Sequence, residues 1–267
     1  MPFLLSAVIL GIVEGLTEFL PVSSTGHLIL VGHLIGFTGA KAATFEVVIQ
    51  LGAILAVVVI YRRRFLDLLH PAPRDEKCFA GMRGIGFLVL TSIPASVVGL
   101  LTKDVIKTYL FGPQTVAWAL AVGAAAILVV EARPRNSRYH SLDDMTPALA
   151  LGIGMFQCLA LWPGFSRSAA TIMGGMILGA DRKLAAEYSF IAAVPIMVAA
   201  TTLDMAENIS LFSANDLIHL TVGFVVSFFA AWIAVKGFIQ LLQRMTLRPF
   251  AVYRLVLAPL VLIFWPE

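Results

Sequence analysis

The sequence predicts an all-α polytopic membrane protein, and three observations support this. Of its 267 residues, 59% are hydrophobic and 13% are charged, whereas a soluble domain carries about 25% charged residues. The mean hydropathy is +0.91. Three stretches, 84–102, 108–130 and 217–235, carry no charge and are near the roughly 20 residues that a membrane span needs. This pattern disfavours a large soluble helical protein.

Six spanning helices are expected, at about 44–61, 84–101, 115–130, 184–202, 217–242 and 250–265. Two further apolar segments are each broken by a proline. Residues 4–35 are broken at Pro21 and residues 147–178 at Pro163. A helix over 4–19 would be about 24 Å long, which is short of the roughly 30 Å hydrocarbon core. We therefore predict two re-entrant helical hairpins, each made of two half-helices with a polar tip.

The two halves of the chain resemble each other, which predicts one membrane domain over 1–267 built from repeats at about 1–140 and 141–267. Pro21 aligns with Pro163 at an offset of 142 (163 − 21), and this sets Ser24 opposite Ser166. Each repeat would hold one hairpin and three spans. Three is an odd number, so the second repeat would enter from the opposite side. Such inverted-topology repeats place their site near the midplane, at discontinuous helices.

The positive charges predict the orientation. Thirteen lysines and arginines fall in loops 62–83, 131–146, 179–184 and 243–249, and only Lys41, Lys103 and Lys107 fall on the other side. Loops rich in Lys and Arg stay in the cytoplasm. The first hairpin would then enter from the outer face. No basic-aromatic motif for nucleic acid is present.

The first polar break carries two carboxylates, Glu14 and Glu18, at i and i+4 on one helical face, about 6 Å apart. In a low-dielectric site they would repel each other unless a cation lay between them. A hard divalent cation, Mg²⁺ or Ca²⁺, takes oxygen ligands and would satisfy both. The alternative is a solvated pair at a helix end. Because long apolar runs flank both residues, we favour a functional site.

Hydroxyl groups and one histidine follow Pro21. Ser23, Ser24 or Thr25 would cap the next half-helix, with Gly26 in its first turn. A helix N-terminus offers free N–H groups and a positive dipole end, which suit phosphate. His27 is a candidate general base or nucleophile. The alternatives are simple capping for the serines and a structural role for the histidine.

The second break holds Arg167, the one basic residue between Arg138 and Arg182. A guanidinium within an apolar run is expensive without an anionic partner, and its fork matches phosphate oxygens. The alternative is a structural ion pair with Glu18 or Glu46. Further hydroxyl donors surround the arginine: Ser166, Ser168 and Thr171. We predict that the two breaks meet inside the membrane as one phosphate site.

Several motifs together resemble the bacterial undecaprenyl-diphosphate phosphatase family of the bacitracin-resistance type. Residues 14–18 are similar to its E-x-x-x-E motif, and residues 163–171 to its P-G-x-S-R-S-x-x-T motif. Segments 21–27 and 45–52 are similar too. By motif position, the family's acidic pair falls on Glu14 and Glu18, and its other site residues fall on Ser24, Thr25, His27, Ser166, Arg167 and Ser168.

The resemblance implies a bacterial inner-membrane enzyme that needs a divalent cation and whose site faces outward. It would remove the terminal phosphate of undecaprenyl diphosphate and so recycle the lipid carrier for cell-wall synthesis. On this hypothesis Arg167 clamps the diphosphate, and Ser24 attacks while Glu18 or His27 takes its proton. An attack by His27 or by water stays open, as does a homodimer. The prenyl tail would lie in an apolar groove open to membrane lipid. The rival function is a transporter or lipid flippase.

Overall fold

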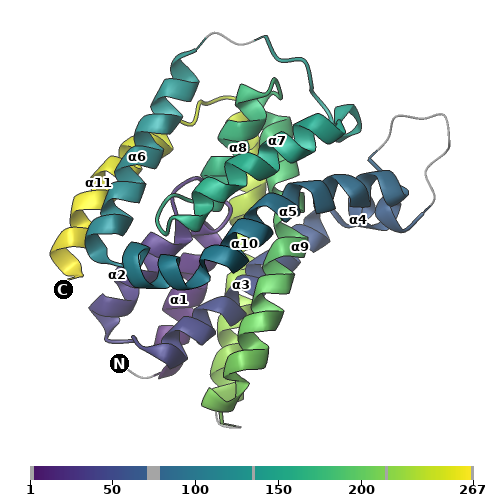
Figure 1. Ribbon diagram of the computed structural model, residues 1–267. Helices are drawn as coiled ribbons and strands as arrows, with labels where there is room; N and C mark the ends of the chain where they lie inside the picture. Colours follow the sequence, from purple (N-terminus) through teal and green to yellow (C-terminus); the bar gives the residue numbers. More distant parts are fainter. Residues whose placement is uncertain (1–2, 71–78, 134–135, 214–215, 266–267) are drawn as a thin grey trace.

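The computed structural model describes residues 3–70, 79–133, 136–213 and 216–265 (Figure 1). Within these residues every regular element is helical, and the one β-bridge, Tyr139 to Ala180, is isolated. The α-helices are α1 Phe3–Thr17, α2 Ser24–Ile35, α3 Ala40–Ile60, α4 Arg62–Leu69, α5 Gly81–Val105, α6 Pro113–Ala132, α7 Pro147–Gln157, α8 Arg167–Ile177, α9 Arg182–Asn208, α10 Leu217–Leu242 and α11 Arg248–Phe264. Shorter helical turns are η1 Ile106–Leu110, η2 Leu142–Asp144, η3 Cys158–Leu161 and η4 Ile209–Leu211. The all-α prediction is confirmed.

Five described helices, α3, α5, α6, α9 and α10, are long and apolar enough to cross a membrane. The chain is therefore a polytopic membrane protein. The sixth predicted span corresponds to α11, which has 17 residues and a length of about 25 Å.

The prediction of a loop over 62–83 is wrong for its first part, because Arg62–Leu69 forms α4. The helix buries Leu68, which lies against Gly84 of α5. An isolated helix of this length is unstable in water, so this tertiary contact stabilises it.

Each polar break ends at a serine that caps the following helix. The two serines match each other at an offset one residue larger than the sequence alignment of the two halves. Ser23 is the N-cap of α2 and accepts from Gly26 N at 3.3 Å, and Ser166 is the N-cap of α8 and accepts from Ala169 N at 3.2 Å. Their φ angles are 70° and 78°, and they are the described non-glycine residues with positive φ. Matching these two N-caps gives an offset of 143 (166 − 23), one more than the sequence alignment, and sets Arg167 opposite Ser24.

Close helix packing holds the short helices in place. α1 packs along α10, where a Cβ on Gly11 would lie 2.7 Å from the carbonyl oxygen of Gly223. α7 packs along α5 in the same way, since a Cβ on Gly154 would lie 2.6 Å from the carbonyl oxygen of Thr91. α3 also packs on α9, and α6 on α11. Each broken segment therefore has a longer helix packed closely along one side.

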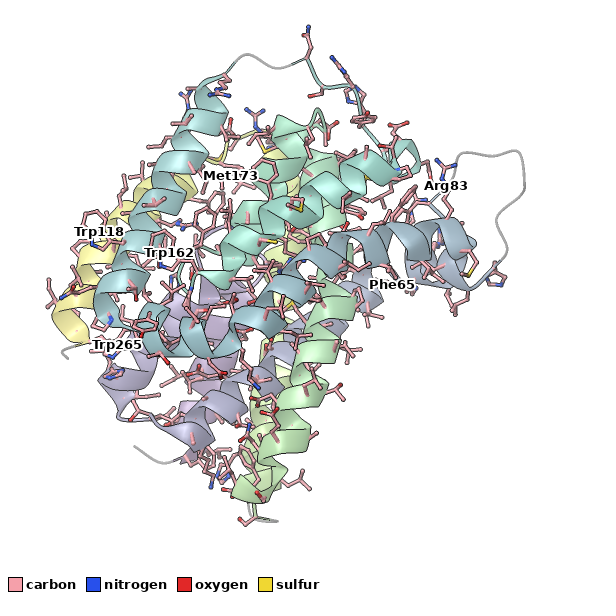
Figure 2. All side chains as sticks on the ribbon, viewed as in Figure 1. Phe65, Arg83, Trp118, Trp162, Met173 and Trp265 are labelled. Atoms are coloured by element: carbon pink, nitrogen blue, oxygen red, sulfur yellow. The ribbon has the colours of Figure 1, made fainter. Side chains whose placement is uncertain are left out.

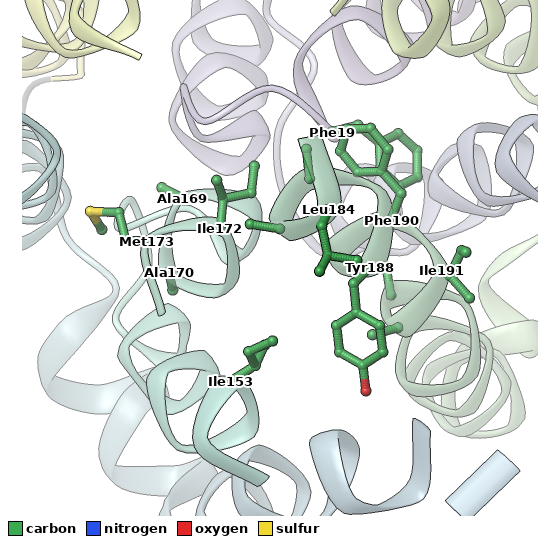
Figure 3. Close-up of a cluster of buried hydrophobic side chains, with 14 of the residues drawn as sticks. Phe19, Ile153, Ala169, Ala170, Ile172, Met173, Leu184, Tyr188, Phe190 and Ile191 are labelled. Carbon is green, nitrogen blue, oxygen red and sulfur yellow. The ribbon is translucent and has the colours of Figure 1, made fainter. Parts of the chain in front are cut away.

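A buried core lies between α8 and α9 and extends to the first break (Figure 3). Phe19, in the first break, meets Phe190 of α9 edge to face with ring centroids 5.3 Å apart. Tyr188 of α9 is fully buried, and its hydroxyl donates to the carbonyl of Phe87 at 3.0 Å. This core ties the first break to the helices that carry the second.

The outer faces of the bundle are apolar, as lipid contact requires. Trp118 on α6 is 66% exposed, and Figure 2 shows it on the outer side of the molecule, on the same side as Trp265. Trp162 lies further in, where its indole N–H donates to the carbonyl of Thr115 at 3.0 Å. The aromatic residues thus serve both the lipid-facing surface and the bundle interior.

The four basic loops meet at one end of the molecule. Arg182 binds Glu131 through two bonds, and Arg248 donates to the carbonyl of Glu131 at 3.3 Å. Arg64 lies 3.4 Å from Asp143. These contacts join the described parts of all four loops. Arg74, Lys77 and Arg135, which the charge count included, lie outside the described residues.

Candidate active site

The two polar breaks are in direct contact. The Ser168 hydroxyl, from the second break, donates to the carbonyl of Leu20 in the first at 2.8 Å. Arg254 of α11 donates to the carbonyl of Pro21 at 3.4 Å and to the carbonyl of Gly164 at 3.2 Å. The prediction that the two breaks meet is therefore confirmed.

Glu18 connects the candidate nucleophile to the arginine. Its Oε2 accepts from the Ser24 hydroxyl at 2.5 Å, and its Oε1 accepts from Arg167 Nη2 at 3.0 Å. Arg167 Nη1 donates to the carbonyl of Ser189 at 3.0 Å, which holds the guanidinium to α9. A hydroxyl bonded to a carboxylate that a third group orients is the arrangement of an activated nucleophile. The alternative predicted for Arg167, an ion pair with Glu18, is present in the same geometry.

A polar pocket of about 140 Å³ opens at this point. Its lining comes from both breaks and from α3, η3 and α9: Glu18, Ser23, Ser24, Thr25, Gln50, Ala160, Pro163, Gly164, Ser166, Arg167 and Met197. The N-termini of α2 and α8 both begin at this lining, at Ser24 and Arg167. Two helix N-termini and a guanidinium make the pocket suited to an anion with several oxygens.

Three predicted binding residues lie behind the pocket lining. Ser168 donates to Leu20, as above. The Thr171 hydroxyl donates to the carbonyl of Arg167 at 2.9 Å and pairs with Ser189 Oγ at 2.6 Å. Gly26 uses its N–H on the Ser23 cap. These three residues hold the chain that carries Ser24 and Arg167.

His27 faces away from the pocket. Its Nδ1 lies 2.7 Å from the carbonyl oxygen of Ser23, and its Nε2 lies 2.6 Å from the Tyr253 hydroxyl. The pair instead lines an apolar pocket of about 330 Å³ between the first break and α11. The structure thus brings Glu18, Ser24 and Arg167 together and leaves His27 outside this group.

Glu14 is buried, with 1% of its surface exposed, and neither carboxylate oxygen has a hydrogen-bond partner among the described residues. It lies one turn before Glu18 and within electrostatic reach of Glu18, Glu46 and Arg167. A buried carboxylate without a partner is costly, and its two free oxygens fit a hard cation. No group of three or more His, Cys, Asp or Glu side chains forms a ready metal cluster in the described part of the chain. Glu14 has two oxygens free for a cation, while those of its neighbour Glu18 accept from Ser24 and Arg167 in this structure.

Arg254 was not predicted as a site residue. It is fully buried, and besides the two breaks it donates to the carbonyls of Ala119 at 3.1 Å and Leu120 at 3.2 Å. A signal existed in the sequence, since Arg254 is a single charge inside the apolar stretch 250–265. Tyr253, the residue before it, bonds His27 through its hydroxyl.

Known proteins are similar to this chain over nearly its whole length. The family model described as "Bacitracin resistance protein BacA" matches residues 7–260. The protein named undecaprenyl-diphosphatase from Maridesulfovibrio salexigens is 68% identical over 265 residues, which cover 99% of this chain and 100% of the relative. The one from Solidesulfovibrio magneticus is 66% identical over 98% of both chains, and undecaprenyl-diphosphatase 1 from Bacillus anthracis is 50% identical over 99% of both. The chain belongs to the bacitracin-resistance protein BacA family.

Proposed function

We propose that this protein hydrolyses undecaprenyl diphosphate to undecaprenyl phosphate and inorganic phosphate, which recycles the lipid carrier for cell-wall synthesis. The observation that carries the proposal is the Ser24–Glu18–Arg167 chain on a pocket at two helix N-termini. The relatives' name supports the substrate. It also favours a phosphatase over a transporter or lipid flippase.

Arg167 is the proposed clamp. When the diphosphate enters, its oxygens compete with Glu18 for the guanidinium, which matches them with paired N–H donors. The N-termini of α2 and α8 add N–H groups of fixed direction. Phosphoryl transfer depends mostly on such positioning and charge stabilisation. The Arg167–Glu18 ion pair is thus the resting state of the clamp.

Ser24 is the proposed nucleophile, and Glu18 takes its proton. The Ser24 oxygen bonds the terminal phosphorus, the P–O bond to the bridging oxygen breaks, and Glu18 passes its proton to the departing undecaprenyl phosphate. Glu18 then takes a proton from water, whose oxygen bonds the phosphoserine phosphorus. The bond between phosphorus and the Ser24 oxygen breaks, Ser24 takes the proton back from Glu18, and inorganic phosphate leaves. Acid quenching during turnover, followed by peptide mapping, should find phosphate on Ser24. If steady turnover left Ser24 unmodified, attack by water would replace this step.

We propose that Glu14, together with Glu18, holds a divalent cation, Mg²⁺ or Ca²⁺. Its two unpartnered oxygens support this proposal. When bound, such an ion neutralises negative charge on the diphosphate. The role of Glu14 is then to hold the positive charge of the cation beside the pocket.

We propose that the fold is an inverted repeat with two re-entrant hairpins, α1–α2 and α7–α8. Two pairs of contacts support it, since α1 packs on α10 and its equivalent α7 packs on α5. The matched N-caps Ser23 and Ser166 support it as well. The basic end of the molecule would then face the cytoplasm of a bacterial inner membrane, and the pocket would open to the outside.

The prenyl tail would leave the pocket on its apolar side, where Ala160 of η3 and Met197 of α9 lie. A homodimer stays a prediction. The mass of the purified complex, compared with the mass of one chain, tests it. Replacing Ala160 by Trp should raise the KM for a long prenyl diphosphate more than for a short one. An equal effect on both would place the tail elsewhere.

The deciding experiment measures phosphate release from undecaprenyl diphosphate by the purified protein in detergent, for wild type, Arg167→Ala and Arg138→Ala. Arg138 is the matched control because it is exposed and its side chain has no partner among the described residues. We expect Arg167→Ala to lower kcat/KM by at least about 1000-fold, in the range of lost transition-state charge stabilisation, and Arg138→Ala to match wild type. Phosphate release by Arg167→Ala within tenfold of wild type would overturn the clamp.

A further inference from the structure

The imidazole of His27 has a defined protonation pattern. Its Nδ1 lies 2.7 Å from the carbonyl oxygen of Ser23, and a carbonyl can only accept, so Nδ1 carries the hydrogen. In the neutral ring Nε2 is then an acceptor, and the Tyr253 hydroxyl, 2.6 Å away, donates to it. The two rings are nearly parallel, with an interplanar angle of 6°. Both ring nitrogens of His27 therefore have a hydrogen-bond partner.

The carbonyl that His27 holds belongs to a strained residue. Ser23 has φ 70° and ψ 96°, a conformation that a non-glycine residue keeps only when its surroundings hold it there. The backbone bond to its carbonyl, from His27 N, is long at 3.4 Å. The short bond comes from the imidazole. Ser24, the next residue, carries the hydroxyl that faces Glu18.

The second break offers an internal comparison. Ser166 has nearly the same φ, 78°, and its carbonyl accepts from Ala170 N at 3.0 Å. Ala170 is the residue equivalent to His27 at the offset of 143. At Ser166 the backbone hydrogen bond is short and its donor is an alanine. At Ser23 the backbone hydrogen bond is long and its donor is a histidine.

Two neighbouring residues of α11 make hydrogen bonds to the first break. Tyr253 reaches the Ser23 carbonyl through His27, and Arg254 reaches the Pro21 carbonyl directly. Both anchors sit on one helix, so they set the path of the chain between Pro21 and Ser24.

We propose that Tyr253 is a positioning residue of the phosphatase, which acts through His27. Its hydroxyl fixes the His27 tautomer with hydrogen on Nδ1, so that the ring holds the Ser23 carbonyl and aims the Ser24 hydroxyl at Glu18. The kinetic part of this proposal rests on the proposed function. Tyr253 touches neither Glu18 nor Arg167 in the described contacts, so it contributes geometry rather than chemistry.

The first test compares Tyr253→Phe with Tyr109→Phe, which removes the same atom from an exposed tyrosine. Because the ring and its packing remain, the melting temperature of Tyr253→Phe should match wild type. We expect kcat to fall about tenfold with KM unchanged, since misplacing a reacting group slows chemistry rather than binding. Tyr109→Phe should match wild type. An unchanged kcat for Tyr253→Phe overturns the proposal.

The second test asks whether Tyr253 acts through His27. In a His27→Ala background, adding Tyr253→Phe should cause no further loss of kcat, because the shared path is already broken. Losses that multiply independently would contradict it. The third test, ¹⁵N NMR of labelled histidine, should show His27 hydrogen on Nδ1 in wild type and a mixture in Tyr253→Phe. This measurement needs no turnover, so it separates a failure of this proposal from a failure of the proposed function.

Discussion

At the scale of single residues, a partly buried arginine and a fully buried one meet the cost of burial in different ways. Arg167 pairs with the carboxylate of Glu18, and a ligand with phosphate oxygens can replace that partner. Arg254 donates to four backbone carbonyls from both breaks and from α6. A Cβ on Gly123 would collide with this guanidinium. Arg254 is thus held by the backbone, whereas Arg167, in the function proposed above, exchanges Glu18 for phosphate oxygens.

Glu14 gives a prediction about charge. Because its oxygens have no partner in the described structure, Glu14→Gln should raise the melting temperature in chelator by a few degrees, as an uncompensated buried charge is removed. Mg²⁺ or Ca²⁺ should raise the melting temperature of wild type, since a ligand that binds the folded state stabilises it, and should not affect the variant. Differential scanning fluorimetry measures both effects.

The matched control for this prediction is Glu207→Gln. Glu207 is exposed and pairs with Lys103 at 3.3 Å, so its loss should leave the cation-dependent shift in place. If Glu14→Gln kept the full cation shift, the cation would not depend on Glu14.

At the scale of elements, the broken helix α1 depends on its contact with α10. A Cβ on Gly15 would lie 2.6 Å from the Cβ of Ala230 and 2.7 Å from the backbone N of Ala231. No side chain fits there without moving the two helices apart. Since α1 ends in the first break, any shift of α1 moves Glu18.

Gly15→Ala should therefore destabilise the protein by about 1–3 kcal/mol, the usual cost of overpacking, and lower turnover as well. The control is Gly237→Ala on α10, where a Cβ would meet nothing within 4 Å. That change should stabilise by about 0.5–1 kcal/mol, because alanine is the better helix former. Thermal melts of the two variants in the same detergent would contradict the packing argument if both moved in the same direction.

Asp216, the N-cap of α10, joins the start of this helix to α3, because it accepts from Lys41 at 2.7 Å, and it also accepts from Ser213 N at 2.9 Å. The Ser213 hydroxyl also donates to Asp216, at 2.8 Å. The contact with Lys41 and the two hydrogen bonds from Ser213 lower the pKa of Asp216 to about 2. A carboxylate with a lowered pKa contributes stability above its unfolded pKa, about 3.9, and this contribution is lost as the pH falls toward the folded value.

We expect wild type to be more stable than Asp216→Asn between pH 5 and 7, and the difference to shrink between about pH 4 and about pH 2. Melting temperatures across this range measure it. Asp67→Asn, a change in exposed α4 with no side-chain partner among the described residues, is the control and should show no such convergence. A difference that grew below pH 4 would reverse the sign and contradict the assignment.

At the scale of the whole molecule, the two ends differ in charge. The described basic loops gather where α6 ends and α9 begins, and the end of α9 lies at the opposite end of the molecule (Figure 1). This separation is what the charge count predicted, and it gives the orientation a direct test.

In a background with Cys78 and Cys158 replaced by serine, Ser210→Cys should react with a membrane-impermeant maleimide on intact cells. Asn136→Cys should react only after the membrane is opened, because the proposed orientation places the basic end in the cytoplasm. Both positions are exposed, so access depends on the side of the membrane. The reverse pattern would invert the molecule and move the pocket to the cytoplasm.

The sequence by itself determined the membrane class, the long apolar helices and the place of the two breaks, but not α4. Long apolar runs form helices because lipid satisfies no backbone polar group, and a proline followed by serines ends one helix and caps the next. The sequence could single out Glu18, Ser24 and Arg167 as site residues. A polar or charged group within an apolar membrane segment is costly and therefore indicates a function.

Only the tertiary structure decided how these residues face one another. His27 lies three residues after Ser24, yet it turns toward Tyr253, 226 residues away along the chain. Arg254 joins both breaks from α11, and Ser23 rather than Ser24 matches Ser166. Local sequence sets where a helix begins, but the direction of a side chain at a break depends on the helix packed against it. That contact forms only when the whole bundle does.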